Sequence, residues 1–463
     1  MNDKMREMLG ALLAEVGWSD APLDRLLIET RPKVLATPWP IATMACMALG
    51  AVGLAASRIH ELRTGERRTV HLDTRAAELA MASSSYLQVD GRPVKFRDPF
   101  TGFYRASNGE WVYLHGNFPH LRDGLLAMLD VENDPDAIRA AVLEREAGDI
   151  EAEAILRGLC AARVRTRADW LAEPHADALT KIQIVRMERV GDAPVMALED
   201  GGAGLSGIRM LDLSRVIAGP MAGRTMAEHG ATVLLIASPR LPFIQSLVID
   251  TGFGKHSVHI DLDDQEGPAM LRGLLVDADV FLDAYRPGAL SARGFGAQQL
   301  GGMKPGLVSI SLSAFSDRGP WSGRRGYDSL VQATMGMTSQ SDGLPPQLLP
   351  CQPLDYLTGY LAAFAAMLGL IRRHEEGGRW HASLSLAATA QWMWRLRAQA
   401  GDDAVHPAAN PTAAGISDLL AVHDTAFGSV TALKPALRMD GVPLVWSRVP
   451  AQLGSDPASW PDV

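Results

Sequence analysis

Residues 208–236 read IRMLDLSRVIAGPMAGRTMAEHGATVLLI and carry the clearest structural pattern in the chain. IRMLDL and ATVLLI are short apolar runs typical of buried β-strands, and the segment between them is helical in character. Gly230 stands where glycine commonly ends a helix. This order predicts two parallel strands joined by a crossover helix.

The same alternation continues downstream in three more apolar runs, HSVHIDL (256–262), DVFLDAY (279–285) and LVSISL (307–312). A helical segment, EGPAMLRGLLVDA (266–278), separates two of them, and a loop-like stretch precedes HSVHIDL. Five strands alternating mostly with helices predict an α/β protein with a doubly wound, Rossmann-like parallel sheet.

The rest of the chain predicts a smaller α+β domain and long connecting helices. Asn108-Gly109 lies between two strand-like runs and indicates a β-hairpin. The glycine-rich stretch 200–207 is expected to be a domain boundary. The expected segments are 1–85 (helical, with one strand-like run at 68–73), 86–200 (small α+β domain), 201–400 (Rossmann-like domain) and 401–463 (linker and closing segment).

Composition limits the possible partners and location. The 463 residues are 47% hydrophobic and 21% charged, with a formal net charge of -9. An acidic chain without a basic cluster argues against nucleic acid or an anionic membrane as the main partner. Three widely spaced cysteines indicate a reducing environment, and the N-terminus does not resemble a signal peptide. The apolar run 41–56 is shorter than the roughly 20 residues of a membrane span, so we expect a buried helix there and a cytoplasmic protein.

Standard ligand-binding signatures are absent from the sequence. GAGLSG (202–207) matches the dinucleotide pattern but precedes the first strand instead of following it. His256 and His259 are three apart on a predicted strand and face opposite sides, so no metal site is expected. SRVIAGPMAGR (214–224) turns from a strand into a helix. That turn is either a seat for phosphate or pantetheine or a plain β–α connection.

Two distant segments of the chain resemble each other. Residues 35–82 and 350–394 both run from a proline-bearing loop through an apolar helix and a charged glycine turn. A strand and a second helix follow in each. This shared order predicts two related pieces joined in one chain.

A set of short motifs, in order, resembles the large domain of the class III CoA-transferases. That family includes formyl-CoA transferase, the carnitine-CoA transferases and α-methylacyl-CoA racemase. The segments that carry the resemblance are Ile208–Pro220, Gly254–Leu262, Tyr285–Gly288, Ser309–Ser311, Arg325–Asp328, Leu354–Asp355 and Gly378–Leu384.

The remaining segments resemble the second half of the same family, but in a different order. YRASNGEWVYL (104–114) and RTRADWLAEP (165–174) are similar to phrases of its small domain, and residues 427–446 to its closing strand segment. The chain therefore resembles a permuted or partly duplicated transferase. The resemblance implies a homodimer, whose interlocked arrangement could instead be rebuilt within one chain.

The resemblance implies that Asp355 is the catalytic nucleophile. In the family, an aspartate attacks the acyl-CoA thioester to form a mixed anhydride, and CoA then passes through an aspartyl thioester to an incoming acid. From the residues alone, Pro353 and the apolar run after Asp355 place it at a helix start. There it is either an ordinary helix N-cap or a carboxylate kept ionised by the helix dipole. The matching stretch Pro38–Met44 contains no acidic residue.

The resemblance also implies coenzyme A, as a substrate and product thioester, and no metal. Arg286, Arg325 and either Lys255 or Arg293 are candidates for the CoA phosphates, or else solvated surface cations. The residues matching the family's CoA-binding positions are Val216, Ile217, Ala218, Ile260, Asp261, Leu262, Ala284, Tyr285, Arg286, Arg325, Gly326 and Tyr327.

Three functions are consistent with these residues. The first is CoA transfer between an acyl-CoA and a carboxylic acid. The second is an acyl-CoA isomerase or racemase, which Tyr327 disfavours because the racemases carry a histidine there and neutral tyrosine is a poor base. The third is a non-catalytic CoA-binding protein, suggested by departures such as Ala237–Arg240, where the family has an acidic-proline element.

Overall fold

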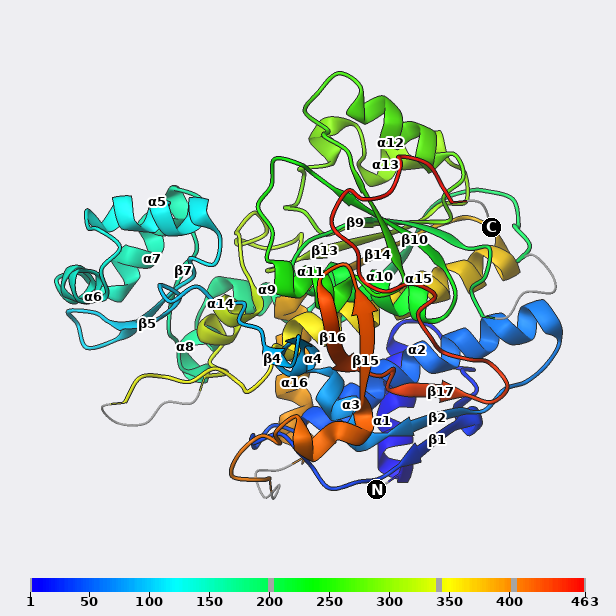
Figure 1. Ribbon diagram of the computed structural model, residues 1–463, viewed down its shortest axis with the longest axis horizontal. Helices are drawn as coiled ribbons and strands as arrows, with labels where there is room; N and C mark the ends of the chain where they lie inside the picture. Colours follow the sequence, from blue (N-terminus) through cyan, green and yellow to red (C-terminus); the bar gives the residue numbers. More distant parts are fainter. Residues whose placement is uncertain (1, 199–203, 339–343, 401–405, 462–463) are drawn as a thin grey trace.

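The computed structural model describes residues 2–198, 204–338, 344–400 and 406–461 as a mixed α/β fold (Figure 1). The expected boundary at 200–207 lies partly outside these residues, because 200–203 are not described. Cys46, Cys160 and Cys351 are buried free thiols.

A seven-stranded sheet forms the centre of the large domain. Its strand order is β11-β10-β9-β12-β13-β14-β8, and only β8 runs antiparallel to its neighbour. The strands are β8 (Arg186–Gly191), β9 (Arg209–Leu213), β10 (Thr232–Ala237), β11 (Lys255–His259), β12 (Val280–Asp283), β13 (Val308–Ser313) and β14 (Arg379–Ser385).

This sheet confirms the α/β prediction. All five strands expected between residues 208 and 312 are present, and they are parallel neighbours because crossover segments connect them. The stretch between β10 and β11 was expected to be a loop, but it contains a short helix whose apolar side is buried. The helices of this part are α10 (Ala218–Glu228), α11 (Gln245–Thr251), α12 (Gly267–Leu275), α13 (Ala297–Met303) and α14 (Asp328–Thr334).

The two resembling segments each form a 24-residue helix, α2 (Ile41–Thr64) and α15 (Pro353–Glu376), and these helices pack against each other. The buried helix expected at 41–56 is confirmed, but α2 continues past that run to Thr64, so the expectation that it is too short to span a membrane was wrong. Both helices are long and apolar enough to cross a membrane, but 83% and 100% of their apolar windows are buried inside the protein. They form the protein core.

The two halves of the chain exchange strands. β8 follows the small domain and pairs antiparallel with β14 of the large sheet. In the same way, β17 (Leu437–Met439) from the C-terminal segment pairs antiparallel with β2 (Val70–Asp73). A strand that the sequence did not predict, β1 (Leu26–Glu29), pairs in parallel with β2 and completes a three-stranded sheet. Each half therefore adds a strand to the sheet of the other.

The small domain projects to one side of the molecule, in cyan in Figure 1. The predicted hairpin is confirmed: β5 and β6 pair antiparallel, and Gly109 adopts φ 78° in the turn, which glycine permits. Apolar side chains of the hairpin and of the helices beside it form a core of their own. The elements are β5 (Gly102–Arg105), β6 (Trp111–Leu114), β7 (Ala161–Arg163), α5 (Pro119–Leu129), α6 (Pro135–Leu143) and α7 (Ala147–Leu156).

The remaining elements connect and cover these units. A four-stranded sheet of order β15-β16-β3-β4 joins residues from both ends of the chain. The strands of this sheet are β3 (Gln88–Val89), β4 (Arg92–Pro93), β15 (Leu420–Thr425) and β16 (Gly428–Leu433). The remaining helices are α1 (Asn2–Glu15), α3 (Thr74–Ala80), α4 (Ser83–Tyr86), α8 (Arg167–Leu171), α9 (Pro174–Thr180) and α16 (Leu386–Ala400), with short 3-10 turns at Leu23–Arg25, Ser291–Arg293 and Ala414–Leu419.

Candidate active site

A cavity of about 390 Å³ lies at the carboxyl ends of the parallel strands of the large sheet. This is the edge where open α/β sheets bind ligands, because the strand-to-helix loops converge there. The last residue of β9, the start of α10 and the residues just after β12 and β13 all contribute to its wall. Asp355, near the start of α15, lies in the same wall.

All but one of the twelve predicted CoA-contacting residues line this cavity. The exception is Ile217, the residue before α10, which lines a smaller neighbouring cavity. The eleven that line the large cavity are Val216, Ala218, Ile260, Asp261, Leu262, Ala284, Tyr285, Arg286, Arg325, Gly326 and Tyr327. Motifs far apart in the sequence are therefore brought to one place.

The loop between β9 and α10 is tightly constrained. Val216 adopts φ 72°, a left-handed conformation that costs a β-branched residue on the order of 1–3 kcal/mol. A Cβ on Gly219 would lie 2.3 Å from the Cβ of Ser214 and 2.9 Å from that of Ala284. The loop follows a fixed path that brings the start of α10 to the cavity wall.

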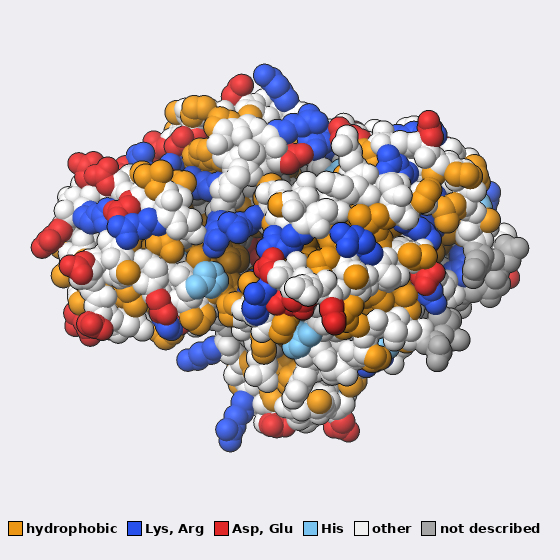
Figure 2. Space-filling model, turned by 90° about the horizontal axis from the view of Figure 1, so that it is seen from above, with side chains coloured by type: hydrophobic (Ala, Val, Ile, Leu, Met, Phe, Trp, Pro, Cys, Tyr) orange, Lys and Arg blue, Asp and Glu red, His pale blue; other side chains and the backbone are white. Residues whose placement is uncertain are grey.

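Six arginines line the cavity, namely Arg215, Arg240, Arg286, Arg293, Arg324 and Arg325. Arg240 and Arg293 pair with acidic residues of the cavity rim, and Arg324 pairs with Glu151. In the part of the chain that the structure describes, Arg286 and Arg325 have no acidic partner, and the neighbouring Arg325 lowers the pKa of Arg286. Basic side chains gather in the middle of the upper face, where the surface is hollowed (Figure 2).

Of the two further phosphate candidates, one was wrong. Lys255 is only 3% exposed, and its ammonium donates to Asp212 Oδ2 at 2.8 Å and to the Pro220 carbonyl at 2.6 Å. It points into the interior between β11 and α10 and stabilises the buried carboxylate of Asp212. Arg293 does line the cavity, where it is paired with Asp263.

Asp355 is the third residue of α15 and is 7% exposed. The alternative that it caps this helix is wrong. The N-cap residue is Gln352, which makes no side-chain cap. Instead, the backbone N–H groups of Leu354 and Asp355 donate to Oδ2 of Asp328, at 2.8 and 3.1 Å. The carboxyl group of Asp355 is thereby left for the cavity.

The expectation that the helix dipole keeps Asp355 readily ionised was also wrong in direction. Burial, and then the nearby charge of Asp328, raise the pKa of Asp355 well above its ordinary value. Burial also raises the pKa of Asp328, to about 6, although the two backbone donors and Gln332 oppose that rise. Because Asp328 receives those hydrogen bonds, burial and the neighbouring charge favour the uncharged form of Asp355 more than that of Asp328.

A second, smaller cavity of about 30 Å³ lies on the other side of Asp355. Its wall includes residues of the N-terminal half that the sequence analysis missed: Phe96, Arg97, His115, Asn117 and Phe118. The sequence motif at 104–114 indicated a small domain, but no sequence signal placed the residues on either side of that hairpin beside Asp355.

His115 lines the small cavity and contacts Tyr327, which lines both cavities. Its ring stacks on Tyr327 with centroids 4.2 Å apart and planes 7° apart. Burial lowers the pKa of His115 to about 3, and burial also raises the pKa of Tyr327. Both rings are therefore neutral at physiological pH.

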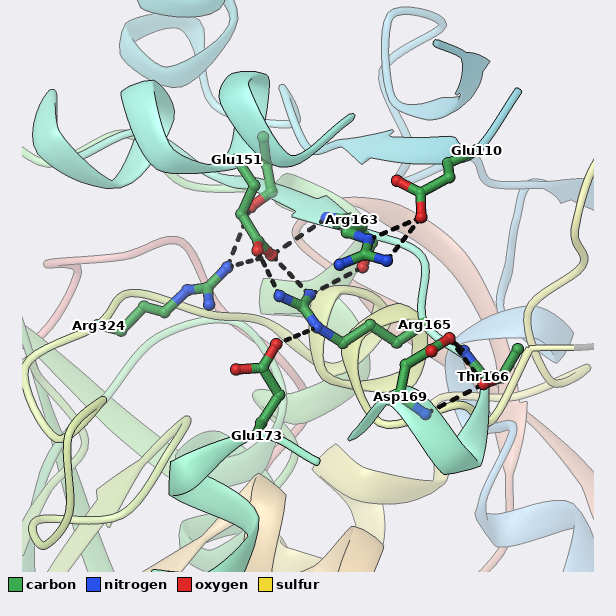
Figure 3. A network of polar contacts seen from close by, with 9 residues as sticks. Glu110, Glu151, Arg163, Arg165, Thr166, Asp169, Glu173 and Arg324 are labelled. Atoms are coloured by element: carbon green, nitrogen blue, oxygen red, sulfur yellow. Dashed lines mark hydrogen bonds and ion pairs between the residues drawn. The ribbon is translucent and has the colours of Figure 1, made fainter. Parts of the chain in front are cut away.

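A buried ionic network fixes the small domain against the loop that carries Arg325 (Figure 3). Glu151 of α7 accepts from Arg165 at 2.6 Å and from Arg324 at 2.6 Å, and Arg165 also reaches Glu173 at 2.8 Å. Burial raises the pKa of Glu151, but its two arginine partners lower it further, so the net pKa falls. The network ties the position of the small domain to the wall of the large cavity.

Comparison with known proteins identifies a family match over residues 205–427, described as CoA-transferase family III. An acyl-CoA transferase of Gibberella moniliformis is 27% identical over 76% of this chain and 70% of the relative. The succinyl-CoA:glutarate CoA-transferase of Homo sapiens is 30% identical over 37% of this chain and 43% of the relative.

Mycobacterium tuberculosis provides a third relative, the probable fatty acyl-CoA transferase Rv3272, which is 31% identical over 37% of this chain and 48% of the relative. A crystal structure of Rv3272 has 28% identity and a TM-score of 0.41, covering 43% of this chain and 58% of that one. Apart from the Gibberella protein, this chain spans about a quarter to a half of the length of the curated relatives it matches. Residues 205–427 of this chain therefore belong to CoA-transferase family III.

Proposed function

We propose that this protein transfers CoA from an acyl-CoA thioester to a carboxylic acid, with Asp355 as the nucleophile. One observation carries the proposal: Asp355 lines both the arginine-lined large cavity and the smaller cavity. A group at that junction can meet a thioester whose CoA part fills one cavity and whose acyl part enters the other.

The large cavity suits coenzyme A. Arg286 and Arg325 have no acidic partner among the described residues, and Nε of Arg325 is buried without a hydrogen-bond partner. Unpaired guanidinium groups are good partners for phosphate oxygens. In this proposal they hold the CoA phosphates, while apolar residues such as Ile260 and Leu262 contact the nucleotide.

The proposed reaction needs no redox step. An oxygen of Asp355 bonds to the acyl carbonyl carbon while the C–S bond breaks, which gives a mixed anhydride and CoA thiolate. The thiolate attacks Cγ of Asp355 and releases the first acid. The second acid attacks the aspartyl thioester, the thiolate leaves again, and its attack on the new acyl carbonyl forms the product thioester and restores the Asp355 carboxylate.

The raised pKa of Asp355 sets a condition on the first step. The attacking group must be the carboxylate, so its proton must leave before the thioester is attacked. The proposed reaction therefore accelerates as pH rises toward the pKa of Asp355.

An acyl-CoA isomerase is less well supported. It needs a base of suitable pKa beside the α-carbon. His115 lines the small cavity, but with its pKa lowered to about 3 it is a weak base, and Tyr327 is neutral.

One experiment separates the candidate functions. The protein is incubated with an acyl-CoA and a different carboxylic acid in deuterated water. Formation of the new acyl-CoA, abolished by Asp355→Asn, supports transfer. Deuterium at the α-carbon without a new thioester indicates isomerisation. CoA binding without either product indicates a non-catalytic CoA-binding protein.

The expected homodimer and cytoplasmic location stay predictions. The strand exchange of β8 and β17 takes place within one chain, which favours an arrangement in which the halves of one chain interlock with each other. Sedimentation of the purified protein measures whether two chains also associate.

A further inference from the structure

We propose that the small cavity recognises a second carboxylate, so that the acids handled by this protein are short dicarboxylic acids. This inference rests on the proposed function, because it assigns the acyl side of the same site. It concerns Arg97, His115 and Asn117, which belong to the N-terminal half and lie outside the family match at 205–427.

Arg97 supplies the positive charge. It lies between β4 and β5, is exposed, and lines the small cavity together with Asp355. Its guanidinium lies over the ring of Phe96 at 5.7 Å, but it makes no hydrogen bond or ion pair with any described residue. Burial raises the pKa of Asp328 and lowers that of His115, and the positive charge of Arg97 opposes the first shift and adds to the second.

Two neutral polar side chains accompany this charge. Oδ1 of Asn117 accepts from the backbone N–H of Asp98 at 3.0 Å and from Oγ1 of Thr101 at 2.8 Å. The side-chain amide is therefore oriented, and its NH₂ group is left to donate. Nδ1 of His115 is buried and has no partner, although the residue is only 5% exposed. A buried polar atom without a partner costs free energy unless a ligand satisfies it.

The acidic residues of this cavity do not oppose an anion as strongly as their number suggests. The carboxylate of Asp328 is occupied by the N–H groups of Leu354 and Asp355 and by the amide of Gln332. Burial and the charge of Asp328 raise the pKa of Asp355, which favours its uncharged form. Arg97 is therefore the charged group left to interact with a ligand among the described residues of this wall.

The size of the cavity favours a short acid. A free volume of about 30 Å³ accommodates about two water molecules, which is close to the size of one carboxylate group. Phe118, Ile244 and Leu247 line both this cavity and an adjoining one of about 50 Å³, and they provide apolar contacts for a few methylene groups. An acid with one carboxylate at Asp355 and another at Arg97 fits this arrangement.

Succinate and butyrate provide a matched test, because both have four carbons and differ in the second carboxylate. We expect the wild type to use succinate as acceptor with the higher kcat/KM. Arg97→Gln should lower kcat/KM for succinate by about 10- to 100-fold, because one charge-assisted pair is lost. The same substitution should change kcat/KM for butyrate by less than about 3-fold. Arg97→Lys keeps the charge and should retain most of the preference.

Arg92→Gln is the matched control, since Arg92 is an exposed arginine of the same segment that does not line the described cavities. Its effect on either acid should be within about 2-fold. A wild type that prefers butyrate, or an Arg97→Gln variant that loses both acids equally, overturns the inference.

Direct binding separates this inference from the proposed function. Succinate binding to the protein without CoA is measured by calorimetry for the wild type and Arg97→Gln, with butyrate as reference. If no acyl-CoA is turned over but succinate binding still depends on Arg97, the transferase proposal fails and the dicarboxylate site stands. If transfer to acids proceeds and Arg97→Gln leaves succinate binding and use unchanged, the dicarboxylate site fails and the transferase proposal stands.

Discussion

Helices α2 and α15 are two versions of one structural unit in the same chain. Each has 24 residues, follows a proline-bearing loop, ends before a glycine, and leads into a strand and a further helix. The third residue is Thr43 in α2 and Asp355 in α15. The helix therefore provides a position near its N-terminus, but only one of the two copies places a carboxyl group there.

Their surroundings differ as much as that side chain. The strand after α15 joins a seven-stranded sheet whose loops form the large cavity, whereas the strand after α2 joins a three-stranded sheet. Asp328 binds the N-terminal N–H groups of α15 through its side chain, while α2 begins after Pro40 without a side-chain cap. The comparison indicates that the proposed site needs the carboxylate, the sheet loops and Asp328 together.

The largest expected effect comes from removing the carboxylate. Asp355→Asn should lower CoA transfer by more than about 1,000-fold, because an amide cannot act as the nucleophile that forms the anhydride. Adding Thr43→Asp to this variant should not restore activity, since α2 lacks the arginine-lined cavity. Transfer rates of the single and double variants test this, and activity restored by the added Thr43→Asp substitution would show that the helix position alone is sufficient.

Packing at the seventh position is the next difference. Met47 stands there in α2, whereas in α15 it is Gly359, where a Cβ would lie 2.6 Å from the carbonyl oxygen of Ala218. Gly359→Ala should destabilise the protein by about 1–3 kcal/mol, because a backbone atom must move. Denaturant unfolding measures this loss. Gly302→Ala is the control, since no atom lies within 4 Å of its added Cβ, and an equal loss there would contradict the account.

The influence of Asp328 appears in the pH dependence. Its negative charge raises the pKa of Asp355. Asp328→Asn removes that charge but keeps an oxygen that can accept from Leu354 and Asp355. The pKa of Asp355 should fall, so the rise in transfer rate with pH should move to lower pH. Rate profiles of both proteins measure this, and an unchanged or alkaline-shifted profile would show that Asp328 does not set the ionisation of Asp355.

The smallest expected effect is on stability. A carboxyl group whose pKa is raised on folding contributes its full stability at pH values below its unfolded pKa and loses it as pH rises through its folded pKa. Asp355→Asn removes the ionisable group, so the variant does not lose this stability as pH rises. Its Tm should match that of the wild type near pH 4 and exceed it by about 2 °C or more at higher pH.

Thr43→Val provides the matched control for that measurement, because it changes the same position of α2 without removing an ionisable group. Its effect on Tm should not vary with pH. A constant Tm difference between Asp355→Asn and the wild type from pH 4 to 8 would contradict the raised pKa.

Local patterns were sufficient to predict five neighbouring strands of the large sheet, and the family resemblance supplied most of its cavity wall. Five apolar runs became five neighbouring strands, and loops that follow strand ends converged because parallel strands share one carboxyl edge. Lys255 was misplaced because it lies within a strand, where side chains alternate between faces, and its own side is covered by α10.

The missed features depend on contacts between distant parts of the chain. The pairing of β8 with β14 and of β17 with β2 leaves no local signal, since each strand is short and its partner is far away in sequence. Arg97 and His115 come to Asp355 from more than two hundred positions away, through the docking of the small domain. Asp328 belonged to a recognised motif, but its role as the cap of α15 depends on the fold.

The most direct test of the central claim is a covalent adduct on Asp355. The protein is mixed with an acyl-CoA, quenched in acid and digested, and the peptides containing Asp355 and Thr43 are analysed by mass spectrometry before and after hydroxylamine. We expect an acyl or CoA adduct on the Asp355 peptide that hydroxylamine removes, none on the Thr43 peptide, and none in Asp355→Asn. Turnover of acyl-CoA without an adduct on Asp355, or an adduct that persists in Asp355→Asn, would contradict the claim.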